Sequence, residues 1–376
     1  MFCERAEEAT AKELHKIHDF GTYIPQDAKL LSREERSKAL SALMFIVEKR
    51  NGVVKTNKCA AGSKQRTFPG YVKPEWDSPT ASTDGVIITS TIEAHEGRDV
   101  AVIDLTNVFL NAHNNEQNLM LLKGKLAELM VQIDPKMYQK HIITSSKGGR
   151  MLYVRLSKAL YGLLQSELLF YRKLRAELEY FGFTVNPYDP CVANKIINDS
   201  QMTVPWNVDD LKIFHKDSRE VTKFIKHFGN IYGDRMTLHR GKVHDYFEMG
   251  LDFSSPNVLN VGMIKYIKKI HKYFPEEIKS SADTPAAEHL SDVREDKKYK
   301  LLPEEQAQAF HRTTAQLLFM CPRVRPDIRT SVSFLCTRCK EPDEDDWGKL
   351  KRILKYLYGT MHMKLCILVD NLQTLT

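Results

Sequence analysis

The chain has 376 residues, of which 42% are hydrophobic and 27% are charged. This composition is typical of a globular protein longer than one ordinary domain, and it excludes fibrous, collagenous and fully disordered chains. The 55 Lys and Arg residues exceed the 48 Asp and Glu residues, which leaves a formal net charge of +7. That excess suits an anionic partner but is too small to demonstrate one.

The sequence has no apolar run near the roughly 20 residues that a membrane-spanning helix needs, and its N-terminal segment has no hydrophobic signal core. We therefore expect an intracellular, cytoplasmic protein without a membrane partner. The seven cysteines are scattered and odd in number, which favours reduced thiols over a disulfide framework. The one C-x-x-C pair, Cys336 and Cys339, lies in an apolar helical pattern, so packing is a better explanation than zinc binding.

The first 50 residues have a helical pattern of apolar residues. A helix is expected to begin near Ser32, where S-R-E-E has the spacing of a capping box, and to end before the turn at Asn51 and Gly52. Its apolar face would hold Ala39, Leu40, Leu43, Ile46 and Val47. Between Glu48 and Glu75 the basic residues form a positive strip without one acid: Lys49, Arg50, Lys55, Lys58, Lys64, Arg66 and Lys73.

The middle of the chain alternates between strand and helix patterns. The expected elements are a buried strand at 100–105, a helix at 160–181, strand-like runs at 191–197 and 203–214, a helix at 218–228, and strands at 236–240 and 246–253. This order is that of a ferredoxin-like split β-α-β sheet with helices on one face. We expect this sheet to be the core of an α+β protein.

After Gly262 the pattern is helical. An amphipathic helix is expected over 263–274, followed by helices at 303–321, 326–340 and 347–358. The expected division is residues 1–95 for N-terminal helices and basic strands, 96–260 for the sheet domain with an insertion at about 111–160, 261–365 for a helical domain, and 366–376 for a tail.

Three carboxylates occupy positions where an ordinary core would not place them. Asp104 interrupts the apolar strand VAVIDL, and Asp209 and Asp210 lie where 203–214 can turn as a hairpin. The first strand and this hairpin are neighbours in a split β-α-β sheet, so we expect the carboxylates to converge. Converging carboxylates repel unless a cation is bound, and Mg²⁺ takes oxygen ligands. Each Asp alone is more simply a turn or capping residue, but together they predict a two-metal site for phosphoryl transfer.

Six segments in chain order resemble the successive blocks of a copia-type retrotransposon reverse transcriptase, the RNA-dependent DNA polymerase domain of a Pol polyprotein. They are DLTNVFLNA, LSKALYGLLQSELLFYRKL, FGFTVNPYDPC, NVDDLKIF, RPDIRTSVSFLCTR and LKRILKYLYGT. Any one segment is a weak signal, but six in order, from about 40 to 364, are highly specific. The resemblance implies a right-hand polymerase fold, with the basic strip in the fingers, the ferredoxin-like sheet as the palm and the helical part as thumb or connection.

The resemblance also assigns roles to residues at the expected catalytic centre. It implies that Asp104 and Asp209 bind two Mg²⁺ ions, or Mn²⁺, with Asp210 as the adjacent acid. Phe109 occupies the position of a steric gate that selects deoxynucleotides, although a core Phe is the alternative. Gln165 matches a Gln beside the sugar and triphosphate of the incoming nucleotide.

Two basic segments are implied to contact phosphates. Lys55, with Lys58 and Lys64 nearby, falls where the fingers supply cations to the triphosphate, and a solvated charge run is the equally good alternative. The helix at 263–274 would follow the duplex through Lys265, Lys268, Lys269 and Lys272, which predicts salt-sensitive binding without sequence preference. The implied partners are an RNA or DNA template with its primer and deoxynucleoside triphosphates; template preference, host and oligomeric state do not follow from the sequence.

Several positions depart from the family pattern. Asn57 stands where an Arg is usual, Asn207 where an aromatic residue or His is usual, and Phe247-Glu248 where L-G is usual; Pro205 lies in the catalytic hairpin and Val108 precedes the gate. Together they suggest an eroded copy, and no ribonuclease H, protease or integrase motif is present. An active polymerase and a catalytically inactive nucleic-acid-binding relic therefore both stay open, while a metal-dependent nuclease would leave the other matches unexplained.

Overall fold

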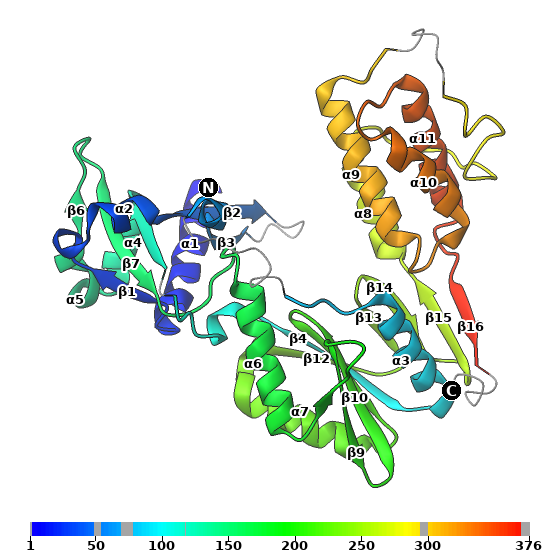
Figure 1. The fold of residues 1–376 in the computed structure, drawn as a ribbon, viewed down its shortest axis with the longest axis horizontal. Coiled ribbons are helices and arrows are strands. Elements are labelled where there is room, and N and C mark those ends of the chain that lie inside the picture. The colour runs from blue at the N-terminus through cyan, green and yellow to red at the C-terminus, as the bar shows by residue number, and fades with distance from the viewer. Residues whose placement is uncertain (1, 49–53, 69–77, 117, 294–299, 370–376) are drawn as a thin grey trace. The chain divides into compact units, whose positions relative to one another are not determined.

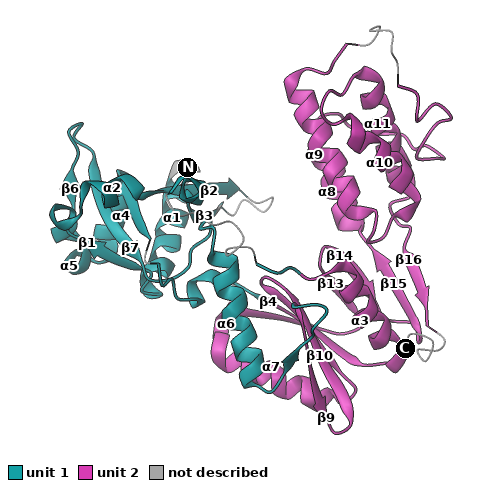
Figure 2. Ribbon diagram, in the orientation of Figure 1, with its two compact units in different colours: residues 1–80, 105–190 teal, residues 81–104, 191–376 magenta. Residues whose placement is uncertain are grey.

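The computed structural model describes residues 2–48, 54–68, 78–116, 118–293 and 300–369. Helices and strands are mixed along the whole described chain, so the predicted α+β class is confirmed. The chain folds into two compact units, and each consists of two separate stretches of sequence (Figure 2). Unit 1 comprises residues 1–80 and 105–190, and unit 2 comprises residues 81–104 and 191–376.

Unit 1 is built on a sheet with the strand order β1-β7-β5-β2-β3, and β6 pairs with the outer part of β7 (Figure 1). The strands of this sheet are β1 (Tyr23–Gln26), β2 (Leu40–Glu48), β3 (Val54–Ala60), β5 (Leu119–Lys123), β6 (Ile143–Thr144) and β7 (Arg150–Leu156). Unit 1 also contains the short strand β8 (Thr184–Val185), which is not part of this sheet. Its helices are α1 (Phe2–Asp19), α2 (Arg33–Lys38), α4 (Lys125–Ile133), α5 (Pro135–Tyr138) and α6 (Ser166–Tyr180). Helices α1 and α4 pack on the sheet, and Leu14, Ile17, Met120 and Val154 are among the fully buried side chains between them.

The helix predicted between Ser32 and Arg50 is wrong beyond its first turns. The capping box at Ser32 is present, with Glu35 as its partner, but α2 ends at Lys38 and residues 40–48 form strand β2. Strand β2 pairs with β3 along its length and with β5 at its start. The apolar residues fit a helical face equally well, and the β-branched Ile46 and Val47 together with two available partner strands decide for a strand. The predicted turn at Asn51 and Gly52 lies outside the described residues, as do the basic residues Lys49, Arg50 and Lys73.

Helix α6 begins six residues later than expected because residues 160–165 form a turn against strand β3. The amide of Ala60 donates to the carbonyl of Tyr161 at 2.7 Å. Gly162 has a φ of +89°, and a Cβ there would lie 2.2 Å from the carbonyl oxygen of Ala60. A Cβ on Gly62 would lie 1.8 Å from the carbonyl oxygen of Gly162. The two glycines therefore allow two backbone segments to approach more closely than any side chain permits.

Unit 2 contains the sheet predicted as the core, with the strand order β12-β4-β11-β10-β9 in this unit. Its strands are β4 (Asp99–Leu105), β9 (Val192–Ile197), β10 (Ser200–Asn207), β11 (Asp210–His215) and β12 (Met236–Arg240). Helix α3 (Thr83–Glu96) packs against β10, and α7 (Ser218–Tyr232) packs against β11 and β12. Strand β4 thus lies between β11 and β12, which both come much later in the sequence. The split topology requires this arrangement.

Helix α7 continues one turn past its predicted end at Gly229. Its aromatic residues follow one another at helical spacing, and Phe224, Phe228 and Tyr232 stack with ring centroids 4.4 Å and 5.7 Å apart. This buried aromatic row stabilises the last turn enough to offset the cost of one glycine, roughly 1 kcal/mol.

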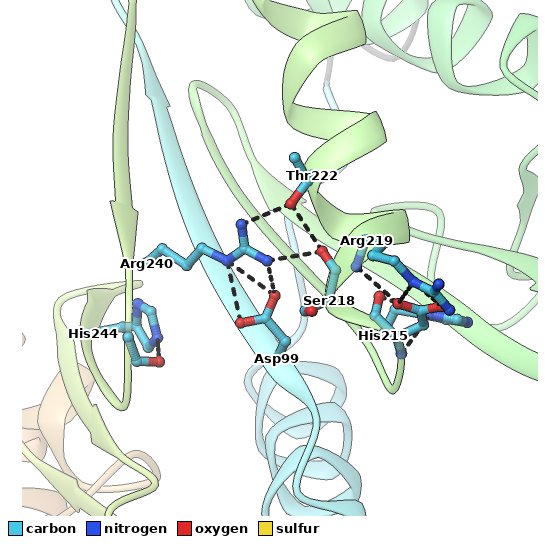
Figure 3. Close-up of polar contacts among 9 residues, drawn as sticks. Asp99, His215, Ser218, Arg219, Thr222, Arg240 and His244 are labelled. Carbon is cyan, nitrogen blue, oxygen red and sulfur yellow. Dashed lines mark hydrogen bonds and ion pairs between the residues drawn. The ribbon is translucent and has the colours of Figure 1, made fainter.

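A polar network attaches the first turn of α7 to the start of β4 and the end of β12 (Figure 3). The guanidinium of Arg240 forms an ion pair with Asp99, and it also donates to Thr222 Oγ1 at 2.9 Å and to the Ser218 carbonyl at 2.8 Å. Asp99 opens β4, Arg240 closes β12, and Ser218 opens α7. One guanidinium therefore holds three elements in register at the end of the sheet opposite to Asp104.

A second sheet, with the order β13-β14-β15-β16, and four long helices complete unit 2 (Figure 1). The strands are β13 (Val243–Tyr246), β14 (Met249–Asp252), β15 (Val258–Gly262) and β16 (Leu365–Leu368). The helices are α8 (Ile264–Tyr273), α9 (Glu304–Met320), α10 (Arg329–Arg338) and α11 (Glu344–Gly359), close to the predicted spans. The strand predicted over 246–253 is wrong: a turn at Phe247 and Glu248 divides it, and the residues on both sides of the turn, in β13 and β14, belong to this second sheet.

Candidate active site

The hairpin of β10 and β11 turns at Val208 and Asp209, as predicted. Asn207 and Asp210 are the last paired residues, directly opposite each other. Val208 has a φ of 53°, a left-handed conformation that a β-branched residue adopts only under constraint. The surrounding sheet imposes this strain, and strained backbone is typical of functional sites.

The register between β4 and β11 brings the predicted carboxylates together. Asp104 lies directly opposite Asp210, and Asp209 follows at the turn. Like charges directly opposite on neighbouring strands destabilise a sheet. Strand pairing thus brings Asp104 next to Asp210, although the two residues are far apart in sequence. The split topology predicts this pairing.

The electrostatics of the three carboxylates are coupled. Burial raises the pKa of Asp209, and the charge of Asp104 raises it further. Burial also raises the pKa of Asp210, to about 7, with added contributions from the charges of Asp209, Asp104 and Glu248. The anions of Asp209 and Asp210 are therefore destabilised by their half-buried positions and by their acidic neighbours, an environment that a bound cation would relieve.

A buried ion pair lies next to this site, and the sequence analysis missed it. Lys212 is two residues after Asp210 and so points to the same face of β11. Its Nζ donates to Ser90 Oγ at 2.6 Å and lies 2.7 Å from Glu93 Oε1, with both charged side chains fully buried. Burial raises the pKa of Glu93 to about 7 and lowers that of Lys212, while the attraction between the two opposes both shifts. A charged residue inside the apolar strand DLKIFH was the available signal.

A cavity of about 540 Å³ in unit 2 opens beside Asp210. Glu248 and Tyr246 line it from the turn between β13 and β14, and Lys265 lines it from α8. Glu248 is one of the residues that depart from the family pattern, in which L-G is usual in place of Phe247-Glu248. The structure places its charge close enough to raise the pKa of Asp210.

The three carboxylates suit a hard divalent cation by their chemistry, because carboxylate oxygens are its preferred ligands. Their side chains are not arranged as a ready three-ligand set: among the described residues, no group of three or more His, Cys, Asp or Glu side chains is placed to hold a metal ion. The three carboxylates therefore fit a divalent cation by their donor type, by their charge and by the register of their strands.

The predicted nucleotide contacts in unit 1 are mostly internal. Phe109 is 5% exposed, and its ring meets those of Tyr161 and Phe170 edge-on, with centroids 4.5 Å and 6.4 Å apart. It lies in the short helix Val108–Asn111. The geometry is that of a packed aromatic cluster, and the gate role stays a prediction.

Gln165 is also buried, with every polar group of its amide engaged inside unit 1. Its Nε2 donates to Glu116 Oε2 at 2.9 Å and to Asn118 Oδ1 at 2.8 Å, and its Oε1 accepts from Gln65 Nε2 at 3.0 Å. Gln65 Oε1 in turn accepts from the amide of Leu164 at 3.1 Å. In this state Gln165 positions the turn before α6 and offers no free group to a nucleotide, so its predicted contact stays a prediction.

Of the three basic residues predicted to supply cations to the triphosphate, Lys58 and Lys64 have their ammonium groups engaged inside unit 1. Lys55 pairs with Val47 through the backbone of β3, and its side chain lies outside the described residues. The prediction that Lys58 supplies a free cation is wrong, because Lys58 is fully buried with Nζ 4.5 Å from the centroid of the Tyr23 ring. Lys64 is occupied as well, since its Nζ donates to the Ser37 and Ala39 carbonyls at 2.5 Å and 3.0 Å. Burial of Lys58 and the backbone partners of Lys64 leave neither ammonium group free for an anion.

The four lysines of α8 are all exposed on the surface of unit 2, as predicted. Two of them form ion pairs with acids of β13 and its following turn: Lys265 with Asp245 in β13, and Lys269 with Glu248 in the turn. Lys268 and Lys272 have no carboxylate partner in the described part of the chain. The α8 lysine row, defined as Lys265, Lys268, Lys269 and Lys272, is therefore half neutralised within the protein.

Among the departures from the family pattern, Pro205 has a visible structural consequence. Strand β10 pairs with β11 at Thr203 and again at Trp206, and the ladder is interrupted between them. Proline has no amide hydrogen to donate, which explains the gap. Pairing with β9 continues through Pro205, opposite Val192, so the hairpin still forms.

No helix in the described ranges is long and apolar enough to cross a membrane. No protein-family model matches the chain. Among solved structures, apo telomerase from Candida tropicalis matches 96% of this chain and 73% of its own, with 10% identity and a TM-score of 0.37.

Three transposon proteins are similar to this chain in sequence. The retrovirus-related Pol polyprotein from transposon TNT 1-94 of Nicotiana tabacum is 21% identical over 382 residues, covering 95% of this chain and 26% of that protein. The Pol polyprotein from transposon RE2 of Arabidopsis thaliana is 24% identical over 308 residues, covering 81% of this chain and 19% of that protein. A putative transposon Ty5-1 protein of Saccharomyces cerevisiae is 25% identical over 221 residues, covering 54% and 64%. This chain therefore spans only part of the length of each relative. It is a homologue of the Pol polyproteins of copia-type retrotransposons.

Proposed function

We propose that this reverse-transcriptase-like chain carries out template-directed DNA synthesis by phosphoryl transfer. The observation that supports this most is the register of β4 and β11, which sets Asp104 directly opposite Asp210 with Asp209 at the adjoining turn. A sheet without a cationic ligand gains nothing from such a pair and loses stability. A site for cations that take part in phosphoryl transfer explains why the acids are there.

In this proposal Asp104, Asp209 and Asp210 hold divalent cations, Mg²⁺ or Mn²⁺. Two bound cations would supply charge stabilisation for the attacking and leaving oxygens of an in-line displacement. The chain itself keeps the acids at one edge of the sheet, because β4 and the β10–β11 hairpin are paired in a fixed register. The buried pair of Lys212 and Glu93 fastens β11 to α3 directly behind that edge.

The proposed partners are an RNA or DNA template with its primer and deoxynucleoside triphosphates. The exposed α8 lysine row supports a nucleic-acid partner, since lysines on one helical face attract phosphates whatever the base sequence. The proposed division of labour follows the expected hand: the sheet with β4 as palm, the α8–α11 helices as thumb or connection, and the β2–β3 hairpin in the fingers.

The test is primer extension by the purified chain and by Asp104→Asn and Asp209→Asn variants. Losing a ligand that supports several kcal/mol of charge stabilisation should lower extension roughly a thousandfold, at about 1.4 kcal/mol per tenfold. Asp199→Asn is the matched control, because Asp199 is an exposed aspartate with a φ of 58° in the β9–β10 hairpin turn, outside the site. Asn tolerates that conformation, so the control should extend normally.

Thermal unfolding with increasing Mg²⁺ gives a second readout that does not depend on activity. The unmodified chain and Asp199→Asn should gain stability with the ion by mass action, and the two site variants should gain less. Extension that survives Asp104→Asn and Asp209→Asn would mean that the acids are not the catalytic site.

A second candidate function is nucleic-acid binding without catalysis. Asn57 is exposed on β3 where the family has an Arg, and Glu248 adds an acid beside Asp210. A chain that binds duplex with salt-sensitive affinity but shows no extension with Mg²⁺ or Mn²⁺ would support this candidate instead.

A further inference from the structure

The turn between β13 and β14 has an unusual backbone. Tyr246 and Met249 are the last paired residues, so Phe247 and Glu248 form a two-residue turn. Their φ values are 56° and 62°. Such a turn normally holds Asn and Gly, because both central positions are left-handed. A bulky aromatic and an acid in these positions are strained, and the strain has to be held by contacts elsewhere.

Those contacts come from Arg323 in the turn that follows α9, and from the interior of unit 2. The guanidinium of Arg323 lies 4.7 Å from the centroid of the Phe247 ring and 3.5 Å from that of Phe319. Arg323 is only 9% exposed, and its Nη1 donates to the Phe319 carbonyl at 2.7 Å. Tyr246, just before the turn, is 2% exposed. Arg323 thus packs against Phe247, the residue next to Glu248 in the turn.

Two acids at the end of β13 and in the following turn, Asp245 and Glu248, pair with the α8 lysine row. Lys265 Nζ lies 2.5 Å from Asp245 Oδ2, and Lys269 Nζ lies 3.4 Å from Glu248 Oε1. Both pairs are open to solvent, with side-chain exposures of 81% and 67% for the first and 51% and 50% for the second. Exposed ion pairs of this kind are weak, so a stronger polyanion can replace the carboxylates.

We propose that Asp245 and Glu248 are affinity-determining residues that stand in for phosphate on the α8 lysine row and that a duplex phosphodiester backbone must displace. The proposal rests on the proposed function, because it takes the row as the surface that holds the duplex. Lys268 and Lys272 make the first contacts, since no described carboxylate competes for them. Lys265 and Lys269 join only after the two acids are released. Affinity for duplex is therefore lower, and less sensitive to salt, than four lysines on one helix would give.

The test compares binding of a primed RNA–DNA hybrid by the full chain and by an Asp245→Asn/Glu248→Gln variant, using fluorescence anisotropy over a range of salt concentrations. The two amides keep the shape of the turn and remove both charges. Each exposed ion pair accounts for roughly a twofold to fivefold effect, so the variant with both pairs removed should bind about 4 to 25 times more tightly. The slope of log affinity against log salt should steepen by about 1 to 2, as released lysines neutralise further phosphates.

Asp234→Asn/Glu305→Gln is the matched control, because it removes two exposed acids of unit 2 outside the turn and changes the net charge equally. Lys268→Ala/Lys272→Ala should weaken binding in either background. If Asp245→Asn/Glu248→Gln binds no better than the charge control while Lys268→Ala/Lys272→Ala still weakens binding, the displacement proposal is overturned and the nucleic-acid surface stands. If neither the unmodified chain nor any variant binds duplex, both the displacement proposal and the proposed nucleic-acid surface fail.

Discussion

Single residues show how far burial changes the chemistry that a residue type suggests. Lys58 belongs to a basic strip in the sequence, yet its ammonium group is fully buried against Tyr23. Burial lowers its pKa to about 7, although the charge of Glu13 opposes the shift. Asp210 shows the converse case, in which burial and three acidic neighbours raise the pKa of a carboxyl to about 7.

Lys58 predicts a measurable pH dependence of stability. Its folded pKa of about 7 lies below its ordinary value of 10.5, so between these values the unfolded chain binds more protons and stability rises with pH. Lys58→Met removes the buried charge and should raise the free energy of unfolding by about 2–4 kcal/mol at pH 6 to 7. The gain should shrink toward pH 10, where the folded lysine is neutral.

Denaturant unfolding of the variant and the unmodified chain at five pH values between 6 and 10 measures this difference. Lys12→Met is the control, because Lys12 is 72% exposed on α1. A gain for Lys58→Met that stays constant over this range would show that packing and not charge is responsible.

Elements in this chain are positioned by a few close backbone approaches and by strand register. The turn before α6 lies against β3 because Gly62 and Gly162 leave room for each other and for Ala60. The candidate site likewise depends on one register, that of β4 with β11, which a shift by one residue would turn to the wrong face.

The glycine contact predicts a contrast between two substitutions in unit 1. Gly162 and Gly148 have similar φ values of +89° and +80°, but a Cβ meets the Ala60 carbonyl at 2.2 Å only in the first case and meets nothing within 4 Å in the second. Gly148→Ala should cost about 1–2 kcal/mol for the left-handed backbone alone. Gly162→Ala should add a steric cost of at least about 1–3 kcal/mol. Equal losses for both in denaturant unfolding would show that β3 and the turn separate freely.

In the whole molecule, the residues that depart from the family pattern occur in both units. Asn57 lies on β3 of unit 1, and Glu248 lies in the β13–β14 turn of unit 2. Within the proposed function the first removes a charge-assisted contact to the triphosphate, worth about 1.5–3 kcal/mol. The second sets an acid against the primer backbone, at a cost of about 1 kcal/mol for each close phosphate.

Restoring both residues should therefore raise primer extension at least about tenfold, at about 1.4 kcal/mol per decade. The substitutions are Asn57→Arg and Glu248→Gly, and glycine also fits the φ of 62° at that turn. Asn57→Arg/Glu248→Gln separates the loss of charge from the relief of strain. Extension no better than that of the unmodified chain would mean either that the copy is inactive for another reason, with Pro205 the next residue to test, or that the departures are tolerated.

The sequence by itself determined the class of the fold, most helix and strand spans in unit 2, and that the strand of Asp104 lies beside the hairpin of Asp209 and Asp210. Periodicity and acids in apolar strands are local signals, and the split topology leaves few ways to pair the strands. Only the tertiary structure decided that residues 40–48 are a strand, that Lys58 and Gln165 point inward, and that Asp245 and Glu248 pair with α8. The strand, the buried side chains and the ion pairs all depend on partners distant in sequence. Such contacts leave no periodic pattern in the residues that make them, so the sequence alone does not predict them.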